Sequence, residues 1–110
     1  MRKLLSFALL SAMAACGSDS TTTTTTPTLT TSVTMQSTAF TPTAIQVSPG
    51  AVVTWTNNDN FQHTVTFDGT VGAIAAYSTG AKTLTMPTTT GTYPYHCTIH
   101  AGMAGTVTVK

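Results

Sequence analysis

From about residue 32 to the C-terminus, apolar residues alternate with threonine and other polar residues in short runs. Ile45 and Val47, for example, flank Gln46 just before a Ser-Pro-Gly turn at 48–50. Side chains two apart on a strand point to the same face, so each run predicts a half-buried strand. The positions that share a predicted inward face are Val33 and Met35; Ile45 and Val47; Ala51, Val53 and Trp55; His63, Val65 and Phe67; Leu84 and Met86; Tyr93, Tyr95 and Cys97; and Val107 and Val109.

The runs are bounded by Pro, Gly and Asn, and no segment of any length has helical periodicity. About seven such strands predict an all-β sandwich of two packed sheets over residues 32–110. The abundant threonine fits this class, because β-branched polar residues suit the solvent face of a strand. A domain of this size buries a limited core, so a bound metal ion would add to its stability.

Residues 1–15 have the pattern of an export signal peptide. Arg2 and Lys3 precede an apolar run that is too short to cross a bilayer, which requires about 20 residues. The small residues before Cys16 resemble a bacterial lipobox, so we predict that the signal is removed and that Cys16 becomes a lipidated first residue. Plain cleavage nearby and a short transmembrane anchor are the alternatives.

Residues 16–31 predict a tether between this anchor and the domain. After Cys16 the segment reads GSDSTTTTTTPTLTT and has almost no apolar residues, so it cannot bury a core. We therefore expect an exported protein, in the periplasm or at the cell surface, held to a membrane through a lipid on Cys16.

The charged residues say little about partners. Once the signal is removed, two lysines and three aspartates remain, a formal charge of minus one before the termini are counted. The chain has no basic patch for nucleic acid and no charged face to steer a partner. We expect a monomer, and a partner that docks to it would use apolar surface.

Most of the reactive side chains gather in one segment, YHCTIHAGM, at 95–103. If Cys16 carries a lipid, Cys97 has no disulfide partner within the chain. An unpaired thiol in an oxidising compartment is vulnerable unless something holds it, and a metal ion would do so.

The pleat of the strands separates candidate ligands from bystanders. Cys97 faces inward at the end of its strand, whereas His96 faces outward. His100 and Met103 follow Cys97 at intervals of three residues, on a loop that can wrap around an ion. His63 points inward from a distant strand and can join them. We expect that His96 does not bind the ion.

This donor set indicates copper. Thiolate and thioether are soft ligands that favour Cu(I), and imidazole suits both oxidation states. Two His and one Cys with a weak axial Met form the arrangement of electron-transfer copper sites. A zinc site more often lacks a thioether. A catalytic Cys–His pair needs a base with its own orienting partner, and no Asp or Asn lies nearby in the sequence to orient one.

From about Val33 to Lys110 the chain resembles the type I (blue) copper proteins, the plastocyanin/azurin cupredoxins. The resemblance rests on the segment 40–59, on the His-Thr-Val strand at 63–65, and on the loop 91–107 with its Cys-x-x-His-x-x-Met spacing, the short form found in amicyanin-like loops. The family implies a cupredoxin-like Greek-key β-sandwich of about seven to eight strands. It also implies one type I copper ion that cycles between Cu(I) and Cu(II). By this resemblance the equatorial ligands would be His63, Cys97 and His100, and the axial ligand Met103.

Two departures from the family pattern bear on the site. The family often has Asn after the first ligand His, where it ties the two ligand segments together, and this chain has Thr64. The hydroxyl of Thr64 can still bond a backbone group of the segment 97–98, although more weakly. Ile99 and Ala101 replace the prolines that usually flank the second ligand His, so we expect a floppier loop without metal.

One-electron transfer is the predicted function, and no enzymatic activity is expected. Redox proteins would dock at an apolar rim formed by Ala101, Gly102 and Ala104 around the exposed ring edge of His100. A copper-binding or delivery protein without an electron-transfer role is an alternative that the ligand set does not exclude.

The same residues also allow a metal-free sandwich used for adhesion or display. In that case Met103 would simply fill the core, and Cys97 would be an inert buried thiol. An enzyme is the least favoured interpretation. Multicopper enzymes need further ligands, and the chain has neither a spare histidine cluster nor a second cysteine in the loop.

Overall fold

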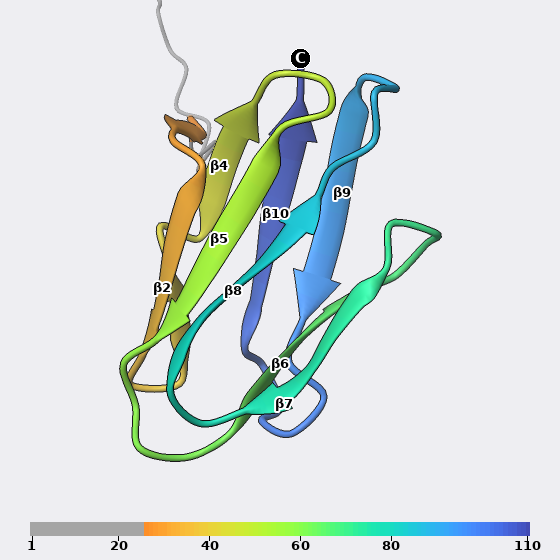
Figure 1. Cartoon of the computed structure of the whole chain (residues 1–110). Helices are drawn as coiled ribbons and strands as arrows, with labels where there is room; N and C mark the ends of the chain where they lie inside the picture. The colour runs from red at the N-terminus through yellow and green to blue at the C-terminus, as the bar shows by residue number, and fades with distance from the viewer. Residues whose placement is uncertain (1–25) are drawn as a thin grey trace, which may run out of the picture.

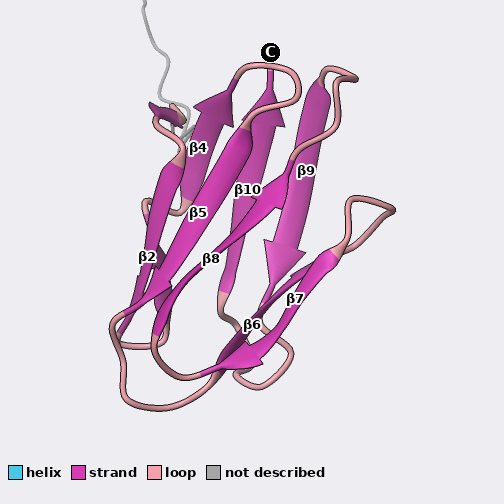
Figure 2. Cartoon of the chain, viewed as in Figure 1, coloured by secondary structure: helices cyan, strands magenta, loops and turns pink. Residues whose placement is uncertain are grey.

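The computed structural model describes residues 26–110, and within that range every regular element is a β-strand (Figure 2). None of these residues forms a helix that is long and apolar enough to cross a membrane. The all-β class predicted from the alternating pattern is confirmed. The strands are β1 (Thr28–Leu29), β2 (Ser32–Gln36), β3 (Ala39–Thr41), β4 (Ala44–Val47), β5 (Val52–Asn57), β6 (His63–Phe67), β7 (Ala73–Tyr77), β8 (Gly80–Thr85), β9 (Gly91–His96) and β10 (Ala104–Val109).

The strands form two mixed sheets that pack face to face. One sheet has the strand order β1-β4-β10-β9-β6-β7, and the other has the order β3-β2-β5-β8. In Figure 1, β2, β5 and β8 lie in front of β4, β10 and β9. β2 runs parallel to β5, and β10 runs parallel to β4. The chain therefore crosses from one sheet to the other instead of forming a simple series of hairpins.

The structure has more strands than the alternating pattern predicts. The additional strands β1 and β3 are only two and three residues long, too short for a period of two to be recognised. β1 pairs with β4 and extends the larger sheet into the segment expected to be a tether. β7 buries Ile74 and Tyr77, three residues apart, because its register with β6 shifts between His63 and Val65.

Most of the predicted inward positions are buried in the core between the sheets, and aromatic rings pack at its centre. Ala51, Leu84 and Tyr93 are only partly buried against this core, which also includes Phe40, Ile74 and Tyr77. The ring centroid of Tyr95 lies 4.6 Å from that of Phe40, 5.5 Å from that of Trp55 and 5.0 Å from that of Phe67. Edge-to-face and tilted pairs of this kind stabilise a core beyond the area that they bury. Tyr95 precedes Cys97 by two residues, so this cluster also fixes the end of β9 that leads into the ligand loop.

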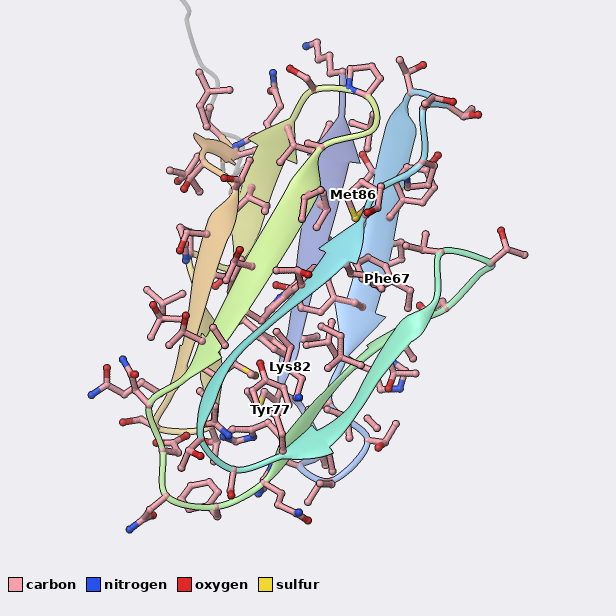
Figure 3. All side chains as sticks on the ribbon, viewed as in Figure 1. Phe67, Tyr77, Lys82 and Met86 are labelled. Carbon is pink, nitrogen blue, oxygen red and sulfur yellow. The ribbon has the colours of Figure 1, made fainter. Side chains whose placement is uncertain are left out.

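The two sheets are also joined where their edge strands β7 and β8 approach each other. The hydroxyl of Tyr77 donates a hydrogen bond to the carbonyl oxygen of Trp55 over 2.7 Å. Burial raises the pKa of Tyr77 to about 12, so the hydroxyl keeps its proton at neutral pH. Nζ of Lys82 lies 5.5 Å from the centroid of the Tyr77 ring (Figure 3). These contacts tie β7, and through it β6, to the smaller sheet.

Gly105 of β10 allows Tyr95 to approach the backbone closely. A Cβ atom at this position would lie 2.7 Å from both Cζ and the hydroxyl oxygen of Tyr95, and 2.9 Å from the carbonyl oxygen of Thr43. All three distances are shorter than a van der Waals contact allows. The absence of a side chain at Gly105 is therefore required by the packing of the strand that carries Tyr95.

Candidate metal centre

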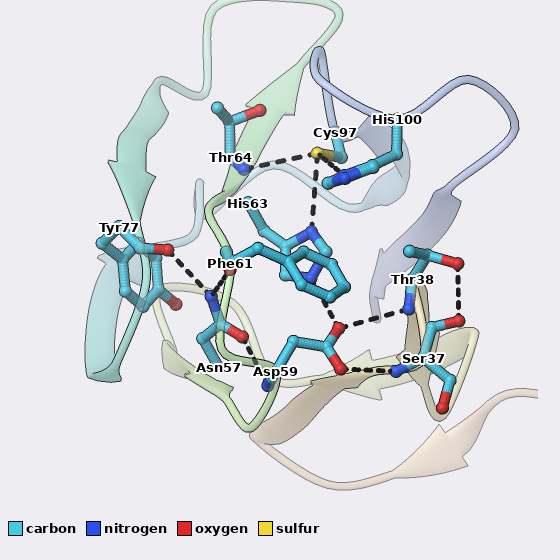
Figure 4. Close-up of polar contacts among 10 residues, drawn as sticks. All are labelled: Ser37, Thr38, Asn57, Asp59, Phe61, His63, Thr64, Tyr77, Cys97 and His100. Atoms are coloured by element: carbon cyan, nitrogen blue, oxygen red, sulfur yellow. Dashed lines mark hydrogen bonds and ion pairs between the residues drawn. The ribbon is translucent and has the colours of Figure 1, made fainter.

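Three of the four predicted ligands meet at one end of the sandwich. His63 begins β6, and Cys97 and His100 lie on the loop between β9 and β10. Sγ of Cys97 is 3.9 Å from Nδ1 of His63 and 3.6 Å from Nδ1 of His100, and the three donor atoms all lie within 4.8 Å of one another (Figure 4). Donors that share one ion at about 2.0–2.3 Å have separations of this order. One ion can therefore contact all three.

The three donors differ in their exposure to solvent. His63 is fully buried, Cys97 is 3% exposed, and His100 is partly exposed. The site thus excludes water around the thiol and the first imidazole, while the second imidazole reaches the surface.

The ligand loop is closed by its own backbone. The N–H of Cys97 donates to the carbonyl oxygen of Met103 over 2.9 Å, and the N–H of Met103 donates to the carbonyl oxygen of His100 over 3.3 Å. Gly102 has a φ of 84°, a left-handed conformation that glycine adopts without strain and that lets the loop turn back toward β10. The Met103 side chain is buried. Its role as the fourth ligand remains a prediction.

Thr64 joins the two segments that carry the ligands. Its N–H donates to Sγ of Cys97 over 3.4 Å, and its Oγ1 accepts a hydrogen bond from the N–H of Thr98 over 2.9 Å. Oγ1 also lies 3.2 Å from Oγ1 of Thr98. The expected bond between the Thr64 hydroxyl and the backbone of the Cys97 segment is therefore confirmed. This contact holds β6 against the loop.

The surroundings of Cys97 favour its thiolate form. Burial raises the pKa of this thiol, but hydrogen bonds from the N–H of Thr64, from the imidazole of His100 and from the N–H of Ile99 oppose burial, and the pKa falls from 9.0 to about 6. A thiolate is the form that binds a metal ion.

A carboxylate and an aromatic ring set the orientation of His63. Nε2 of His63 lies 2.7 Å from Oδ2 of Asp59, which leaves Nδ1 facing Cys97. The ring centroid of Phe61 lies 5.2 Å from that of His63 and 5.4 Å from that of His100. Phe61 therefore packs against both imidazoles, although its own side chain is 42% exposed.

Asn57 organises the loop that connects β5 to β6. This residue is buried, and its Nδ2 donates to the carbonyl oxygens of Phe61 and Tyr77 over 3.0 and 2.8 Å. Its Oδ1 accepts from the N–H of Asp59 over 2.8 Å.

The sequence pattern did not single out Asn57, Asp59 or Phe61, because the polar run at 57–60 has the composition of an ordinary turn. A carboxylate four residues before a candidate ligand His is the signal that could have found Asp59, since metal-bound histidines usually donate their second N–H to a carboxylate, a carbonyl or water.

His96 lies outside the cluster, as its position on the strand predicts. Its side chain is 44% exposed, and its Nδ1 lies 3.2 Å from Oδ1 of Asp68 at the surface. Cys16, the predicted lipidation site, lies outside the described residues.

The donor set fits copper. A thiolate and two imidazoles in reach of one ion, with a buried thioether on the same loop, provide the soft and intermediate ligands that copper prefers in both of its common oxidation states.

Comparisons with known proteins agree with this site. The sequence matches the model of the cupredoxin-like domain over residues 5–109. It is 37% identical over 84 residues to a plastocyanin from Scenedesmus fuscus, in an alignment that covers 64% of this chain and 86% of that relative.

Solved structures of amicyanin are similar in fold and sequence. An oxidised single-substitution variant of amicyanin has a TM-score of 0.66 and 29% identity, with 72% of this chain and 80% of that chain covered. The reduced Cu(I) form of another amicyanin variant has a TM-score of 0.59 and 33% identity over the same shares of the two chains.

Proposed function

The chain belongs to the cupredoxin-like domain family, and from this premise we propose that it binds one copper ion and carries single electrons between redox proteins. The observation that carries the proposal is the convergence of Nδ1 of His63, Sγ of Cys97 and Nδ1 of His100 within 4.8 Å. Met103 would be the weak fourth ligand. Cupredoxins are electron carriers rather than enzymes, and we propose no reaction beyond electron transfer.

Bound copper would supply a one-electron couple between Cu(I) and Cu(II). The protein's part is to hold the ligands in place while the charge changes. His63 is held by Asp59, the thiolate of Cys97 by the N–H of Thr64, and the loop by the backbone bonds of Met103. Because protein groups fix the ligands and burial excludes water, little rearrangement accompanies the transfer of an electron.

Electrons would enter and leave through the imidazole of His100, which alone among these three donors is partly exposed. Ala101 and Ala104 are exposed beside it, and Phe61 and Ile99 add larger apolar surface, with 42% and 47% of their side chains exposed. An apolar rim of this kind suits brief docking of a redox partner over a small contact area.

Copper delivery is the rival function, and the burial of the site argues against it. A delivery protein must release its ion readily, whereas His63 is fully buried and Cys97 is 3% exposed. Slow exchange of bound copper with a competing chelator supports electron transfer. Exchange that is complete on mixing would favour delivery.

We propose in addition that the protein is exported and anchored to a membrane by a lipid on Cys16, facing the periplasm or the cell exterior. The basic start, the short apolar run and the small residues before Cys16 support this. Expression of the whole chain in a bacterial host tests it: the protein should pellet with membranes, and Cys16→Ser should appear in the soluble fraction. An unchanged distribution of the variant would contradict lipid anchoring at this residue.

Titration of the purified protein with copper tests the ligand assignment. Cys97→Ser removes the thiolate and should weaken binding by orders of magnitude, because one of three strong donors is lost. His96→Asn is the matched control, since it removes an adjacent imidazole that lies outside the cluster. Equal binding by Cys97→Ser and the parent protein would show that the cluster does not hold the ion.

A further inference from the structure

Asp59 connects the candidate ligand His63 to a turn in the other sheet. Its Oδ2 lies 2.7 Å from Nε2 of His63, and the side chain of Asp59 is only 10% exposed. The same carboxylate accepts hydrogen bonds from the N–H of Ser37 over 2.8 Å and from the N–H of Thr38 over 3.2 Å (Figure 4). One side chain therefore touches both the metal centre and the connection between β2 and β3.

The contact with Asp59 determines which nitrogen of His63 carries a proton. A carboxylate can only accept a hydrogen bond, so Nε2 must carry the hydrogen that it donates to Asp59. In the neutral ring the remaining nitrogen, Nδ1, then has a free lone pair. Nδ1 is the nitrogen that faces Sγ of Cys97, at 3.9 Å. The carboxylate thus selects the tautomer that can bind an ion in the cluster.

The turn on the other side holds the carboxylate itself in place. Ser37 and Thr38 have φ values of 55° and 56°, the left-handed conformation required at both central positions of a two-residue type I′ hairpin turn. Their N–H groups both point to Asp59. The backbone N–H of Asp59 in turn donates a hydrogen bond to Oδ1 of the buried Asn57. Asp59 is therefore fixed at both its backbone and its side chain.

We propose that Asp59 is a positioning residue of the metal centre, which holds Nδ1 of His63 ready to bind copper and transmits the rigidity of the β2–β3 turn to that ligand. This proposal rests on the proposed function, because it concerns the same site. An anionic acceptor on the second imidazole nitrogen also makes the ring a stronger donor. Stronger donation favours Cu(II) over Cu(I), so Asp59 lowers the reduction potential of the centre.

Asp59→Asn tests the role with little change in volume. The amide has one uncharged oxygen in place of two charged ones. It therefore cannot accept the hydrogen bonds from His63, Ser37 and Thr38 as well as the carboxylate does. Asp68→Asn is the matched control, because Asp68 also pairs with a histidine, His96, but at the surface.

Nitrogen NMR of the histidine rings in the metal-free protein is the first measurement. The parent protein and Asp68→Asn should show His63 with its proton on Nε2, and Asp59→Asn should show a mixture of tautomers. This measurement does not depend on copper. It therefore distinguishes failure of the present proposal from failure of the proposed function, which would show as a parent protein that takes up no copper.

Copper affinity and reduction potential are the second pair of measurements. Asp59→Asn should bind Cu(II) about 10–100-fold more weakly, the usual effect of losing such a partner, and its potential should be higher than that of the parent. Asp59→Glu keeps the negative charge, so its Cu(II) affinity and its reduction potential should both lie between those of Asp59→Asn and the parent. If Asp59→Asn matches Asp68→Asn in tautomer, affinity and potential while remaining folded by circular dichroism, the proposal is wrong.

Discussion

Cys97 combines a buried side chain with a set of hydrogen-bond donors that stabilise its negative charge. Burial alone would raise the pKa of the thiol, yet the N–H of Thr64 and the imidazole of His100 help to lower it to about 6. The site is therefore prepared for a metal ion, because a thiol at its ordinary pKa would first have to lose a proton at neutral pH.

The titration of Cys97 in the metal-free protein checks this. Ultraviolet thiolate absorbance, taken as the difference between the parent and Cys97→Ser so that Cys16 cancels, should rise with a midpoint near pH 6 rather than near the ordinary value of 9.0. The depressed pKa also means that the free energy of unfolding rises as the pH increases from about 6 to 9.0. In this range the thiol of Cys97 is protonated in the unfolded chain and ionised in the folded one. A midpoint near 9 would show that the donors do not act on the thiol.

The cluster of candidate ligands was predictable from the sequence, and the residues that orient it were not. Soft and aromatic donors such as Cys97 and His100 are rare in this chain, and their spacing marks them. Asp59 and Asn57 lie in a run of polar residues whose composition is that of any turn. Their roles depend on contacts with distant segments, namely Ser37 and Tyr77, which spacing along the chain does not reveal.

At the level of elements, the predicted strands are those that keep a strict period of two over several residues. β5 and β10 show that pattern, and their inward positions are buried as expected. β7 was missed because a register shift against β6 breaks the alternation, and β1 and β3 because they are too short to display it. Alternation in the sequence therefore predicts the inner strands of both sheets but misses three of the four edge strands, β1, β3 and β7.

The pairing of β9 with β10 depends on Gly105, and Gly105→Ala should destabilise the fold. The added methyl group would meet Tyr95 at 2.7 Å, and Tyr95 is 1% exposed and has no room to move. Overpacking of this kind costs about 1–3 kcal/mol. Urea unfolding of the metal-free protein measures it. Gly69→Ala is the control, because its Cβ would meet nothing within 4 Å. Equal stability of the two variants would contradict the packing described for β9.

At the scale of the whole molecule, the apolar residues around His100 lie at the end of the sandwich where the loops of both sheets meet. Phe61 comes from the loop between β5 and β6, and Ile99 from the loop between β9 and β10 (Figure 1). Both residues leave close to half of their surface exposed. Formation of one rim from two distant segments explains why the sequence did not predict Phe61 as part of it.

Electron self-exchange between copies of the copper-loaded protein tests the rim without requiring knowledge of the natural partner. Phe61→Lys and Ile99→Lys should each slow the exchange several-fold, because a charge in the rim disfavours close approach of two copies. Val52→Lys is the control, since Val52 is 51% exposed but begins β5 at the far end of that strand from the loop that carries Phe61. If Val52→Lys slows exchange as much as the rim variants do, electrons do not pass through the rim.

The absorption and electron paramagnetic resonance spectra of the Cu(II)-loaded protein test the central claim most directly. A thiolate from Cys97 bound to copper together with His63 and His100 predicts an intense visible charge-transfer band, blue to green in colour, with a narrow copper hyperfine splitting. A faint spectrum with only weak copper-centred transitions, or a protein that takes up no copper, would contradict the account.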